Sequence, residues 1–445
     1  MQGVCEILGG WPVGLRIAGH YLSSTGESTV DYLRWLEQEP FKELGDGEHQ
    51  EENAALLLRR SVAQVSKDAR LALSVAGILA FAPIAHEPVA AVLDGDDRRA
   101  RTALNELVNY GLLERRNERW QISHALIHTY ARSELASSKD SLKRLAEYYI
   151  AFCQTQSKAG LEGYACLDKE RAHCLRLMES CLDCVLQEEV QALAGAVNTY
   201  LDRQGHWTEW QATLRLSIKA AQAAGNRKNE GWCLHSLGYI CAKRNEYVEG
   251  LKYYTQSLEI RRDIGDEKGE AWTLNNMGVI YQAQDKSKLA IQYYKQSLPI
   301  MQKIGDKSGE GTILSNIGMV YSVQQGNNET ALQYFEALSI LQKAGDKVHA
   351  GILLDNFAAI HRAQGKPLKA IEDGKRALDL FLQAGDLAEE AQCRRNLGAT
   401  YYALGDLAAA EEYISQAVQI TEPIGHPLLA YWREELELVR AEWRA

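Results

Sequence analysis

Residues 265–305, GDEKGEAWTLNNMGVIYQAQDKSKLAIQYYKQSLPIMQKIG, decide the fold of this 445-residue chain. Within this stretch, apolar residues recur at three- and four-residue intervals in two runs, which aligns them along one face of a helix. A polar turn at residues 284–287 separates the runs. The stretch therefore predicts two helices joined by a tight turn. The apolar positions are Leu274, Met277, Gly278 and Tyr281 in the first run, and Ala290, Ile291, Tyr294 and Leu298 in the second.

The pattern returns at a period near forty along the second half of the chain. We expect Gly265 and Gly305 to close helix pairs as left-handed caps, because glycine adopts a positive φ without strain. Propeller blades also recur with a similar period, but the four alternating strands that each blade needs are absent. The recurring glycines are Gly225, Gly265, Gly305, Gly345, Gly385 and Gly425, and the tracts that share one register are residues 235–238, 275–278, 315–318, 355–358 and 395–398.

This pattern of paired helices, with a small residue at Gly278 and an alanine at Ala290, resembles the tetratricopeptide repeat. That repeat usually spans about 34 residues. The longer form seen here, with a Leu-Asn-Asn-x-Gly start, is similar to the kinesin light chain subgroup. The resemblance covers five units over residues 225–424 and implies a right-handed superhelix with a concave binding surface. A degenerate first repeat is predicted at 186–224, and residues 425–445 are predicted to form a C-terminal capping helix.

Two positions depart from the repeat pattern. Pro299 lies inside a second helix, where proline removes a backbone hydrogen bond, so we expect a kink or an early stop there. One unit carries an extra residue near 326–328.

Residues 1–140 follow a different pattern. Residues 9–19 open a helix with Pro12 in its first turn. An apolar helical run at 104–113 leads into two short alternating segments within 114–122, joined at Asn117, which predicts a β-hairpin. Helices followed by one hairpin make a winged-helix domain. The expected organisation is a helical subdomain over 1–60, a winged-helix domain over 61–140, a helical connector with the degenerate first repeat over 141–224, the five repeats over 225–424 and the capping helix over 425–445.

Two motifs in this region resemble the NB-ARC signalling ATPases, the STAND class. Gly10-Trp11-Pro12-Val13 is similar to their Gly-Leu-Pro-Leu motif, and Ser123-His124-Ala125-Leu126 is similar to their Met-His-Asp motif, with its His kept and its Asp lost. The resemblance implies that residues 1–60 correspond to the ARC region, that Pro12 packs on an adenine and that His124 reaches the β-phosphate of bound ADP in an autoinhibited state. On the residues alone, Pro12 also fits a plain helix start and His124 a polar residue at the base of the wing.

The phosphate-binding part of such an ATPase is missing from the sequence. No Gly-x4-Gly-Lys-[Ser/Thr] loop occurs, and Gly365-Lys366 is followed by Pro367 in a turn between helices. We therefore predict a protein that is not an enzyme and has no cofactor of its own, with ADP or ATP bound only if a nucleotide-binding domain is supplied in cis or in trans. A chain that begins at Met1 in the middle of this family pattern is expected to be a C-terminal fragment or the product of a naturally split gene.

The net charge and the absence of targeting patterns limit the kinds of partner that we expect. The net charge of −10 disfavours nucleic-acid and anionic-membrane binding, which need a basic surface. Signal-peptide and membrane-spanning patterns are absent from the sequence, so we expect a cytoplasmic protein with no membrane partner. One alternative stays open, a transcriptional regulator that binds DNA through the winged helix. The basic residues that favour it are Arg98, Arg99, Arg101, Arg115, Arg116 and Arg119.

The nine cysteines are expected to be reduced thiols. His173, Cys174, Cys181 and Cys184 could form part of a zinc site, since Cys-x2-Cys is a common half-site. The cysteines also share one helical stripe with Leu177, where free cysteine packs as a small apolar side chain. We favour packing and predict no metal site.

Asparagine recurs at one register of the predicted first helices, although it is a poor residue for a helix interior. In tetratricopeptide arrays the first helices line the concave surface, so these amides are expected to form a ladder that binds the backbone of an extended peptide. An alternative is that they bond neighbouring helices and hold the superhelix together. The ladder is Asn276, Asn316, Asn356 and Asn396, and the residues expected to read ligand side chains are Gln282, Tyr239 and Arg395.

Together these patterns predict an all-α fold in which a winged-helix-type domain with one small β-hairpin precedes a right-handed tetratricopeptide-repeat superhelix. The function predicted first is protein–protein interaction and signal sensing. The chain would be the regulatory and sensor part of a STAND-type switch whose repeats bind a protein or peptide ligand.

Overall fold

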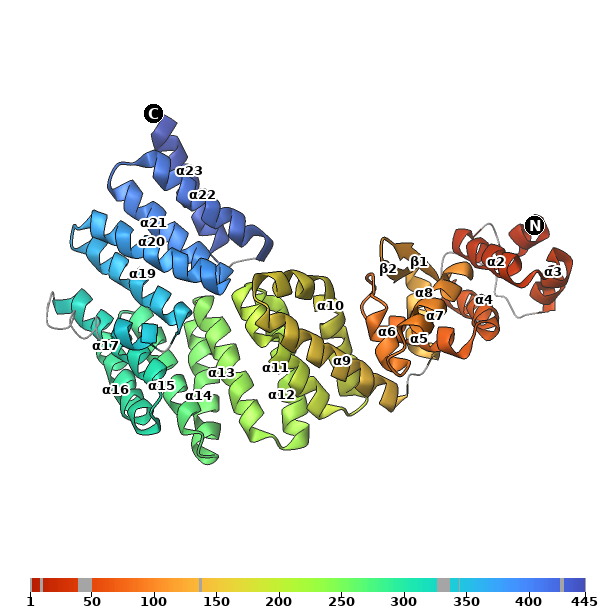
Figure 1. The fold of residues 1–445 in the computed structure, drawn as a ribbon, viewed down its shortest axis with the longest axis horizontal. Coiled ribbons are helices and arrows are strands. Elements are labelled where there is room, and N and C mark those ends of the chain that lie inside the picture. The colour runs from red at the N-terminus through yellow and green to blue at the C-terminus, as the bar shows by residue number, and fades with distance from the viewer. Residues whose placement is uncertain are drawn as a thin grey trace. The chain divides into compact units, whose positions relative to one another are not determined.

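A computed structural model describes residues 2–8, 11–38, 50–135, 138–325, 337–343, 345–424 and 428–444. The described chain is mostly helical and contains one small β-hairpin, as the sequence predicts (Figure 1). It divides into two compact units, residues 1–154 with 166–193, and residues 155–165 with 194–445.

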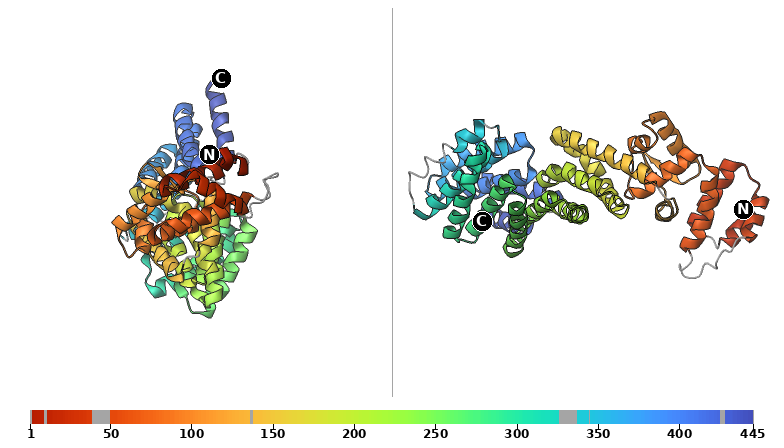
Figure 2. Two further views of the ribbon diagram at one scale, coloured as in Figure 1. Left: turned by 90° about the vertical axis from the view of Figure 1, so that its right-hand side faces the viewer. Right: turned by 90° about the horizontal axis from the view of Figure 1, so that it is seen from below.

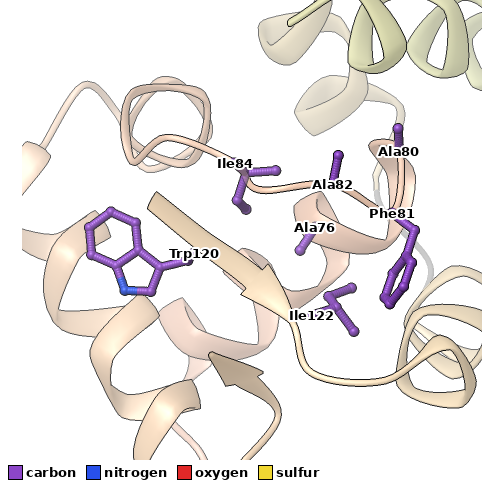
Figure 3. A pocket seen from close by; sticks show the side chains of 7 residues that line it. All are labelled: Ala76, Ala80, Phe81, Ala82, Ile84, Trp120 and Ile122. Atoms are coloured by element: carbon purple, nitrogen blue, oxygen red, sulfur yellow. The ribbon is translucent and has the colours of Figure 1, made fainter. Parts of the chain in front are cut away.

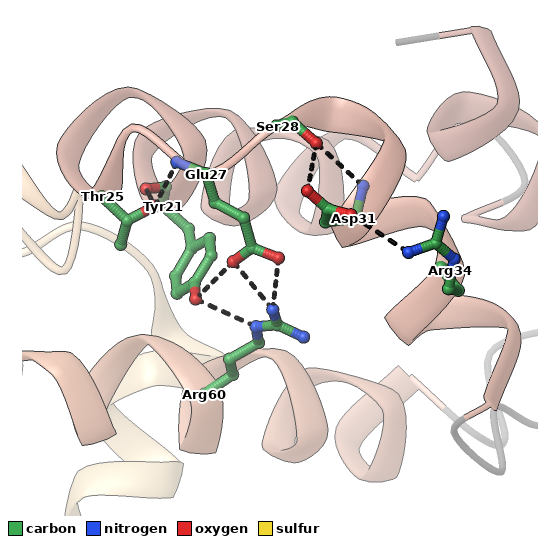
Figure 4. A network of polar contacts seen from close by, with 7 residues as sticks. All are labelled: Tyr21, Thr25, Glu27, Ser28, Asp31, Arg34 and Arg60. Atoms are coloured by element: carbon green, nitrogen blue, oxygen red, sulfur yellow. Dashed lines mark hydrogen bonds and ion pairs between the residues drawn. The ribbon is translucent and has the colours of Figure 1, made fainter.

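The first unit begins with α1 (Gln2–Ile7), α2 (Pro12–Thr25), α3 (Thr29–Gln38) and α4 (Gln50–Gln64). Arg60 on α4 connects these helices. Its guanidinium donates to both carboxylate oxygens of Glu27, at 2.6 and 2.8 Å, and to the hydroxyl of Tyr21 at 3.0 Å (Figure 4). The same group lies 4.0 Å from the ring centre of Trp35 on α3. A largely buried charge with this many partners is stabilised, so Arg60 holds α2, α3 and α4 together.

The next elements are α5 (Lys67–Ile78), α6 (Glu87–Val92), α7 (Asp97–Asn109), strands β1 (Leu113–Arg116) and β2 (Arg119–Ile122), and α8 (Ala125–Glu134). The two strands pair antiparallel with Leu113 opposite Ile122, and Asn117 in the turn between them has φ 57°. The predicted hairpin is thereby confirmed. Helices followed by one hairpin match the element order expected of a winged helix.

A small apolar pocket lies beside this hairpin (Figure 3). Its lining comes from the end of α5, the segment that follows it and β2, and Ile84 also bridges to Trp120 through two backbone hydrogen bonds. The side chains leave no space for even a water-sized ligand. The lining residues are Ala76, Ala80, Phe81, Ala82, Ile84, Trp120 and Ile122.

Three long helices follow: α9 (Lys139–Lys158), α10 (Leu161–Asp183) and α11 (Gln187–Arg203). The division into two units falls within them. In the first unit, Glu170 on α10 accepts a hydrogen bond from the Tyr149 hydroxyl on α9 at 2.9 Å and pairs with Arg119 on β2. Because each of these polar groups has a partner, the network can be buried without a large desolvation penalty.

The second unit is a series of antiparallel helix pairs (Figures 1 and 2). Each pair buries one apolar stripe against its neighbours, as a stacked repeat array does. Its helices after α11 are α12 (Trp207–Ala224), α13 (Arg227–Lys243), α14 (Tyr247–Asp263), α15 (Glu267–Ala283), α16 (Ser287–Ile304), α17 (Lys307–Gln325), a helical segment at 337–343, α19 (Lys347–Ala363), α20 (Pro367–Ala384), α21 (Leu387–Ala403), α22 (Leu407–Ile424) and α23 (Leu429–Arg444).

The recurring Gly-Asp pair forms the boundary between repeats. The glycine ends one second helix in the left-handed conformation, as predicted for Gly265 and Gly305, which have φ of 69° and 73°. The aspartate then begins the next helix, because its carboxylate accepts the backbone N–H three residues later, as Asp266 does from Gly269 at 3.0 Å. Gly225, Gly345 and Gly385 also have positive φ, and Gly425 lies outside the described residues.

In two of the pairs, the small residue of the first helix admits an aromatic ring from the second. A Cβ added at Gly278 would lie 2.5 Å from Cε1 of Tyr294, and one added at Gly238 would lie 2.7 Å from Cε1 of Tyr254. These distances are far below van der Waals contact. The close approach predicted from the sequence at Gly278 is therefore confirmed.

The early stop considered at Pro299 is wrong, because α16 continues through it to Ile304. Pro299 is exposed, whereas Tyr294 and Met301 on the same helix are fully buried. Packing of the buried face therefore maintains the helix on both sides of the missing N–H. The extra residue near 326–328 lies outside the described residues.

The helix α23 packs against α22, and its role as a capping helix stays a prediction. Trp432, Leu436 and Val439 are buried against α22. Because α23 buries one face and exposes the other, it covers apolar surface that a further repeat would otherwise have to cover.

Candidate ligand-binding face of the repeat array

The first helices of successive repeats are α13, α15, α17, α19 and α21, and we call the surface that they share the first-helix face. The Nδ2 of Asn316 donates to Oδ1 of Asn275 at 2.9 Å, and the Nδ2 of Asn396 donates to Oδ2 of Asp355 at 2.7 Å. Asn276 Nδ2 likewise lies 3.2 Å from the Nε2 of a histidine in the preceding first helix, His235. Each of these three amides thus bonds to a residue 41 positions earlier.

This geometry matches the alternative considered for the asparagines, in which they connect neighbouring helices. It fixes the orientation of the amides on the first-helix face. Asn356 occupies the same register on α19 and is half-buried. Contact of these four residues with a ligand stays a prediction.

The three residues expected to read ligand side chains have partners within the chain. Gln282 accepts a hydrogen bond from the Tyr294 hydroxyl at 2.8 Å. Tyr239 packs edge-on against Trp210, with ring centres 6.0 Å apart. Arg395 forms two hydrogen bonds to Glu435 on α23, at 2.8 and 2.9 Å, and so joins the last repeat to the capping helix. Their role in binding also stays a prediction.

Asp355 differs from the other positions of the ladder. Its Oδ2 accepts from Asn396, but its Oδ1 is buried and has no hydrogen-bond partner within the described chain. Burial, together with the negative charge of Glu389, raises the pKa of this carboxyl to about 6. A hydrogen-bond donor placed near the unpaired oxygen would stabilise the buried carboxylate of Asp355.

Sequence reasoning missed a contact between distant parts of the second unit. The guanidinium of Arg203, at the end of α11, donates to the carbonyl of Ala384 at 2.7 Å, and Gln204 donates to the carbonyl of Gly385 at 3.4 Å. The ammonium of Lys243, at the end of α13, pairs with Glu389 in the first turn of α21 at 2.5 Å. We call this contact the seam. Its partners are 146 to 181 residues apart in the sequence, so no local pattern indicates it.

The seam also contains two carboxyl groups with altered acidity. Burial, together with the charge of Asp386, raises the pKa of Asp202 to about 7. Burial, together with the charge of Glu389, raises the pKa of Asp386 to about 6. Burial disfavours the ammonium of Lys243, yet the charge of Glu389 holds its pKa well above the usual value. The seam is therefore a cluster in which charge depends on pH near neutrality.

In the first unit, the helix that begins at Pro12 contacts the segment around Ser123. Arg16 on α2 donates to the carbonyl of Ser123 at 2.9 Å and pairs with Glu114 at 3.2 Å. The Nδ1 of His124 accepts the backbone N–H of Leu126 at 3.2 Å, so this imidazole caps the start of α8. Pro12 is exposed at the start of α2, and Gly10 lies outside the described residues.

The arginines that favoured DNA binding have partners within the first unit. Five of the six make hydrogen bonds or ion pairs that use part of their capacity to contact phosphates. The pairs are Arg99 with Asp68, Arg101 with His86, Arg115 with the carbonyl of Asn117, Arg116 with Glu114, and Arg119 with Glu170.

The cysteines considered for zinc do not converge. Cys174 and Cys181 are buried in α10, whereas Cys184 is exposed beyond its end. A hydrogen bond with Cys153, 3.6 Å away between sulfur atoms, and burial raise the pKa of Cys174 well above its usual value. Such thiols are unreactive. Across the described ranges, His, Cys, Asp and Glu side chains form no group of three that fits a metal ion, and none of the helices there has an apolar stretch of the length that crossing a bilayer requires.

Comparisons with known proteins identify the repeat. The tetratricopeptide repeat family profile matches residues 232–303, 269–344 and 349–422, which confirms the repeats predicted from the sequence. No curated protein has significant sequence similarity to the chain.

Several solved structures are similar to the chain at low identity. A Signal Transduction ATPase with Numerous Domains (STAND) protein with a tetratricopeptide repeat sensor, from Pyrococcus horikoshii, is 17% identical over 96% of this chain and 69% of its own, with a TM-score of 0.39. NprR in complex with its cognate peptide NprX is 17% identical over 68% of this chain and 84% of its own, with a TM-score of 0.45. The repeats of a Podosopora anserina kinesin light chain protein are 17% identical over 42% of this chain and 92% of their own, with a TM-score of 0.31.

Proposed function

We propose that this chain is a non-enzymatic protein–protein interaction and sensing module whose repeat array binds a protein or peptide ligand. The observation that carries the proposal is the array itself, which matches the tetratricopeptide repeat family and presents amides at one register of its first helices. Stacked repeats of this kind form extended surfaces that bind other proteins.

The ladder suits an extended peptide. An amide has both a donor and an acceptor, as a peptide backbone does. The internal bonds of Asn316 and Asn396 hold their side chains in fixed orientations, which lowers the entropy lost when a ligand binds. Gln282, Tyr239 and Arg395 would contact the ligand at the edges of this ladder.

We further propose that the chain is the regulatory and sensor part of a STAND-type switch. The contact of Arg16 with the carbonyl of Ser123 supports this, because Arg16 lies on α2, the helix that begins within the first motif, and Ser123 belongs to the second. In such a switch, Pro12 and His124 would contact ADP held by a nucleotide-binding domain in cis or in trans. The chain itself would then have a regulatory rather than a catalytic role.

A peptide-display selection against the full chain tests ligand binding. The best selected peptide is measured by calorimetry against the wild type, Asn356→Ala and Asn316→Ala. We expect at least about tenfold weaker binding in the asparagine variants, the effect of about 1.4 kcal/mol lost from backbone hydrogen bonds. Val248→Ala, a change at a residue 83% exposed on the second helix α14, is the matched control and should bind as the wild type does.

Two outcomes would contradict the proposal. One is a selection that returns no peptide with saturable binding. The other is unchanged peptide affinity in both asparagine variants together with a lower melting temperature, which would assign the amides to holding the helices together.

A further inference from the structure

The turn at residues 384–389 differs from the other turns between repeats. At Gly225, Gly265, Gly305 and Gly345 an added Cβ would meet nothing within 4 Å, so these caps lie in open space. At Gly385 the added Cβ would lie 3.2 Å from Leu161, and Tyr164 is close behind at 3.7 Å. The sequence alone offers no reason for this difference, because Gly345 and Gly385 both precede aspartate.

The same turn carries three polar contacts to distant helices. The carbonyls of Ala384 and Gly385 accept hydrogen bonds from Arg203 and Gln204, and Glu389 pairs with Lys243. The side chains of Lys243 and Glu389 are 35% and 17% exposed, so this ion pair is partly shielded from solvent and stronger than a surface pair. Together these contacts connect α11 and α13 to α20 and α21.

The seam adjoins the amide ladder. Glu389 and Asn396 lie on α21, and Asn396 bonds to Asp355 on α19. Glu389 and Asn396 are about two helical turns apart on α21, so the ion pair and the ladder lie along the same side of that helix. A ligand that approaches the ladder from α13 would therefore meet the seam first.

We infer that residues 384–389 act as a latch that closes the repeat array on itself and restricts access to the first-helix face. The inference rests on the proposed function, since it concerns regulation of the same surface. In the closed array, α13 and α21 are held together by the Lys243–Glu389 pair, and the turn occupies hydrogen-bond donors of Arg203 and Gln204. Release of the latch exposes those donors and the neighbouring amides to a ligand.

The latch responds to pH through two carboxyl groups. The charges of Asp386, Arg203, Lys243 and Glu389 act on Asp202, and those of Glu389, Arg203 and Lys243 act on Asp386. The phenols of Tyr164 and Tyr239 lie within electrostatic reach of both carboxyls. Their pKa values, about 7 and about 6, lie above those of free aspartate, so the closed array binds protons more tightly than the open one. By linkage, closure is favoured at low pH and weakens as pH rises from about 4 to about 7.

Charge reversal in the full chain tests the latch. We compare the wild type, Lys243→Glu, Glu389→Lys and the double variant by hydrogen–deuterium exchange resolved to peptides and by small-angle X-ray scattering. Each single variant places like charges at the seam, so we expect about tenfold faster exchange at residues 200–206 and 384–390 and a larger radius of gyration. The double variant restores the pair with exchanged signs, and we expect it to return toward wild-type values.

Lys303→Glu is the matched control. Lys303 pairs with Glu267 at 2.5 Å, but both residues are well exposed and belong to the same repeat. Reversing this charge should leave exchange at residues 200–206 and 384–390 unchanged.

The pH dependence of the latch is measured on the wild type. Hydrogen–deuterium exchange at residues 200–206 and 384–390, corrected for intrinsic rates, should be faster at pH 8 than at pH 5.

The latch is refuted if both single variants exchange as the wild type does at these segments, or if the double variant is no closer to the wild type than they are. A pH effect of opposite sign would refute the role of the carboxyl pair. None of these measurements needs a ligand. If the latch fails its test, the peptide-binding test of the proposed function is unaffected. If the peptide-binding test fails, the measurements on the latch remain valid.

Discussion

At the scale of single residues, small and polar side chains set the geometry of the array. Gly278 could be identified from the sequence because its position recurs in register, and the ring of Tyr294 lies against it. Asp202 could not be identified in this way. Its environment depends on Asp386, which is close in space only because the array folds back on itself.

Replacing Gly278 by alanine should destabilise the array. The new Cβ would lie 2.5 Å from the ring of Tyr294, a fully buried side chain. We expect a loss of about 1–3 kcal/mol in the free energy of unfolding, measured by chemical denaturation. Gly195→Ala on α11 is the control, because nothing lies within 4 Å of its added Cβ. Gly195→Ala should raise the free energy of unfolding by about 0.5–1 kcal/mol. Equal effects of the two alanine substitutions would contradict the packing argument.

Replacing Asp202 by asparagine should stabilise the protein in a pH-dependent way. Burial raises the pKa of Asp202 to about 7, so the ionised carboxylate is disfavoured in the folded state. The folded protein therefore loses stability as pH rises from about 4 to about 7 and this carboxyl ionises. A neutral asparagine does not ionise and avoids this loss of stability. We expect a gain of about 1–3 kcal/mol at pH 8 and a smaller gain at pH 5, measured by urea denaturation. Asp263→Asn, at an exposed carboxylate on α14, should show no such dependence; a larger gain at pH 5 than at pH 8 would overturn the argument.

At the scale of helices, the sequence predicted most boundaries because each is marked by a local signal. The Gly-Asp pair ends one helix and begins the next through the conformation of Gly265 and the capping carboxylate of Asp266. The early stop considered at Pro299 was wrong because local propensity was outweighed by packing of the buried face of α16. The seam could not be predicted, since hydrophobic periodicity carries no information about pairs as distant in the sequence as Lys243 and Glu389.

Replacing Pro299 by alanine should stabilise α16. The change restores a backbone N–H that can bond to the carbonyl of Lys295, and Pro299 is exposed, so little packing is lost. We expect a gain of about 1–3 kcal/mol, measured by denaturation. A lower melting temperature in the alanine variant would indicate that the proline is required for the shape of this helix.

At the scale of the whole molecule, two units with different organisation share one chain. The repeats of the second unit were predicted from sequence self-similarity alone. The first unit has no such repetition, so its expected relation to the STAND class depends on two short motifs. Of these, the structure gives His124 a local role as the cap of α8.

The isolated chain should not hydrolyse ATP and should bind ADP weakly or not at all. Pro12 and His124 would supply two contacts, whereas phosphate-loop enzymes rely on a backbone nest and a metal ion. We expect the melting temperature to rise by less than about 1 °C in about 1 mM ADP. The His124→Ala variant should have a lower melting temperature than the wild type, by the same amount with and without ADP, because it loses a helix cap. An ADP-dependent rise that disappears in His124→Ala would show instead that this chain holds a nucleotide by itself.

The Gly-Asp boundary and the seam together constrain how this protein can evolve. Because one dipeptide both ends a repeat and begins the next, duplication or deletion of one whole repeat would create no unsatisfied helix ends. Such events are therefore expected to be tolerated in an open array. The seam also constrains the number of repeats, because Gly385 meets Leu161 and Gln204 only when the intervening repeats bring it there. Relatives that gain or lose one repeat should also lose the matched residues at both sides of the seam.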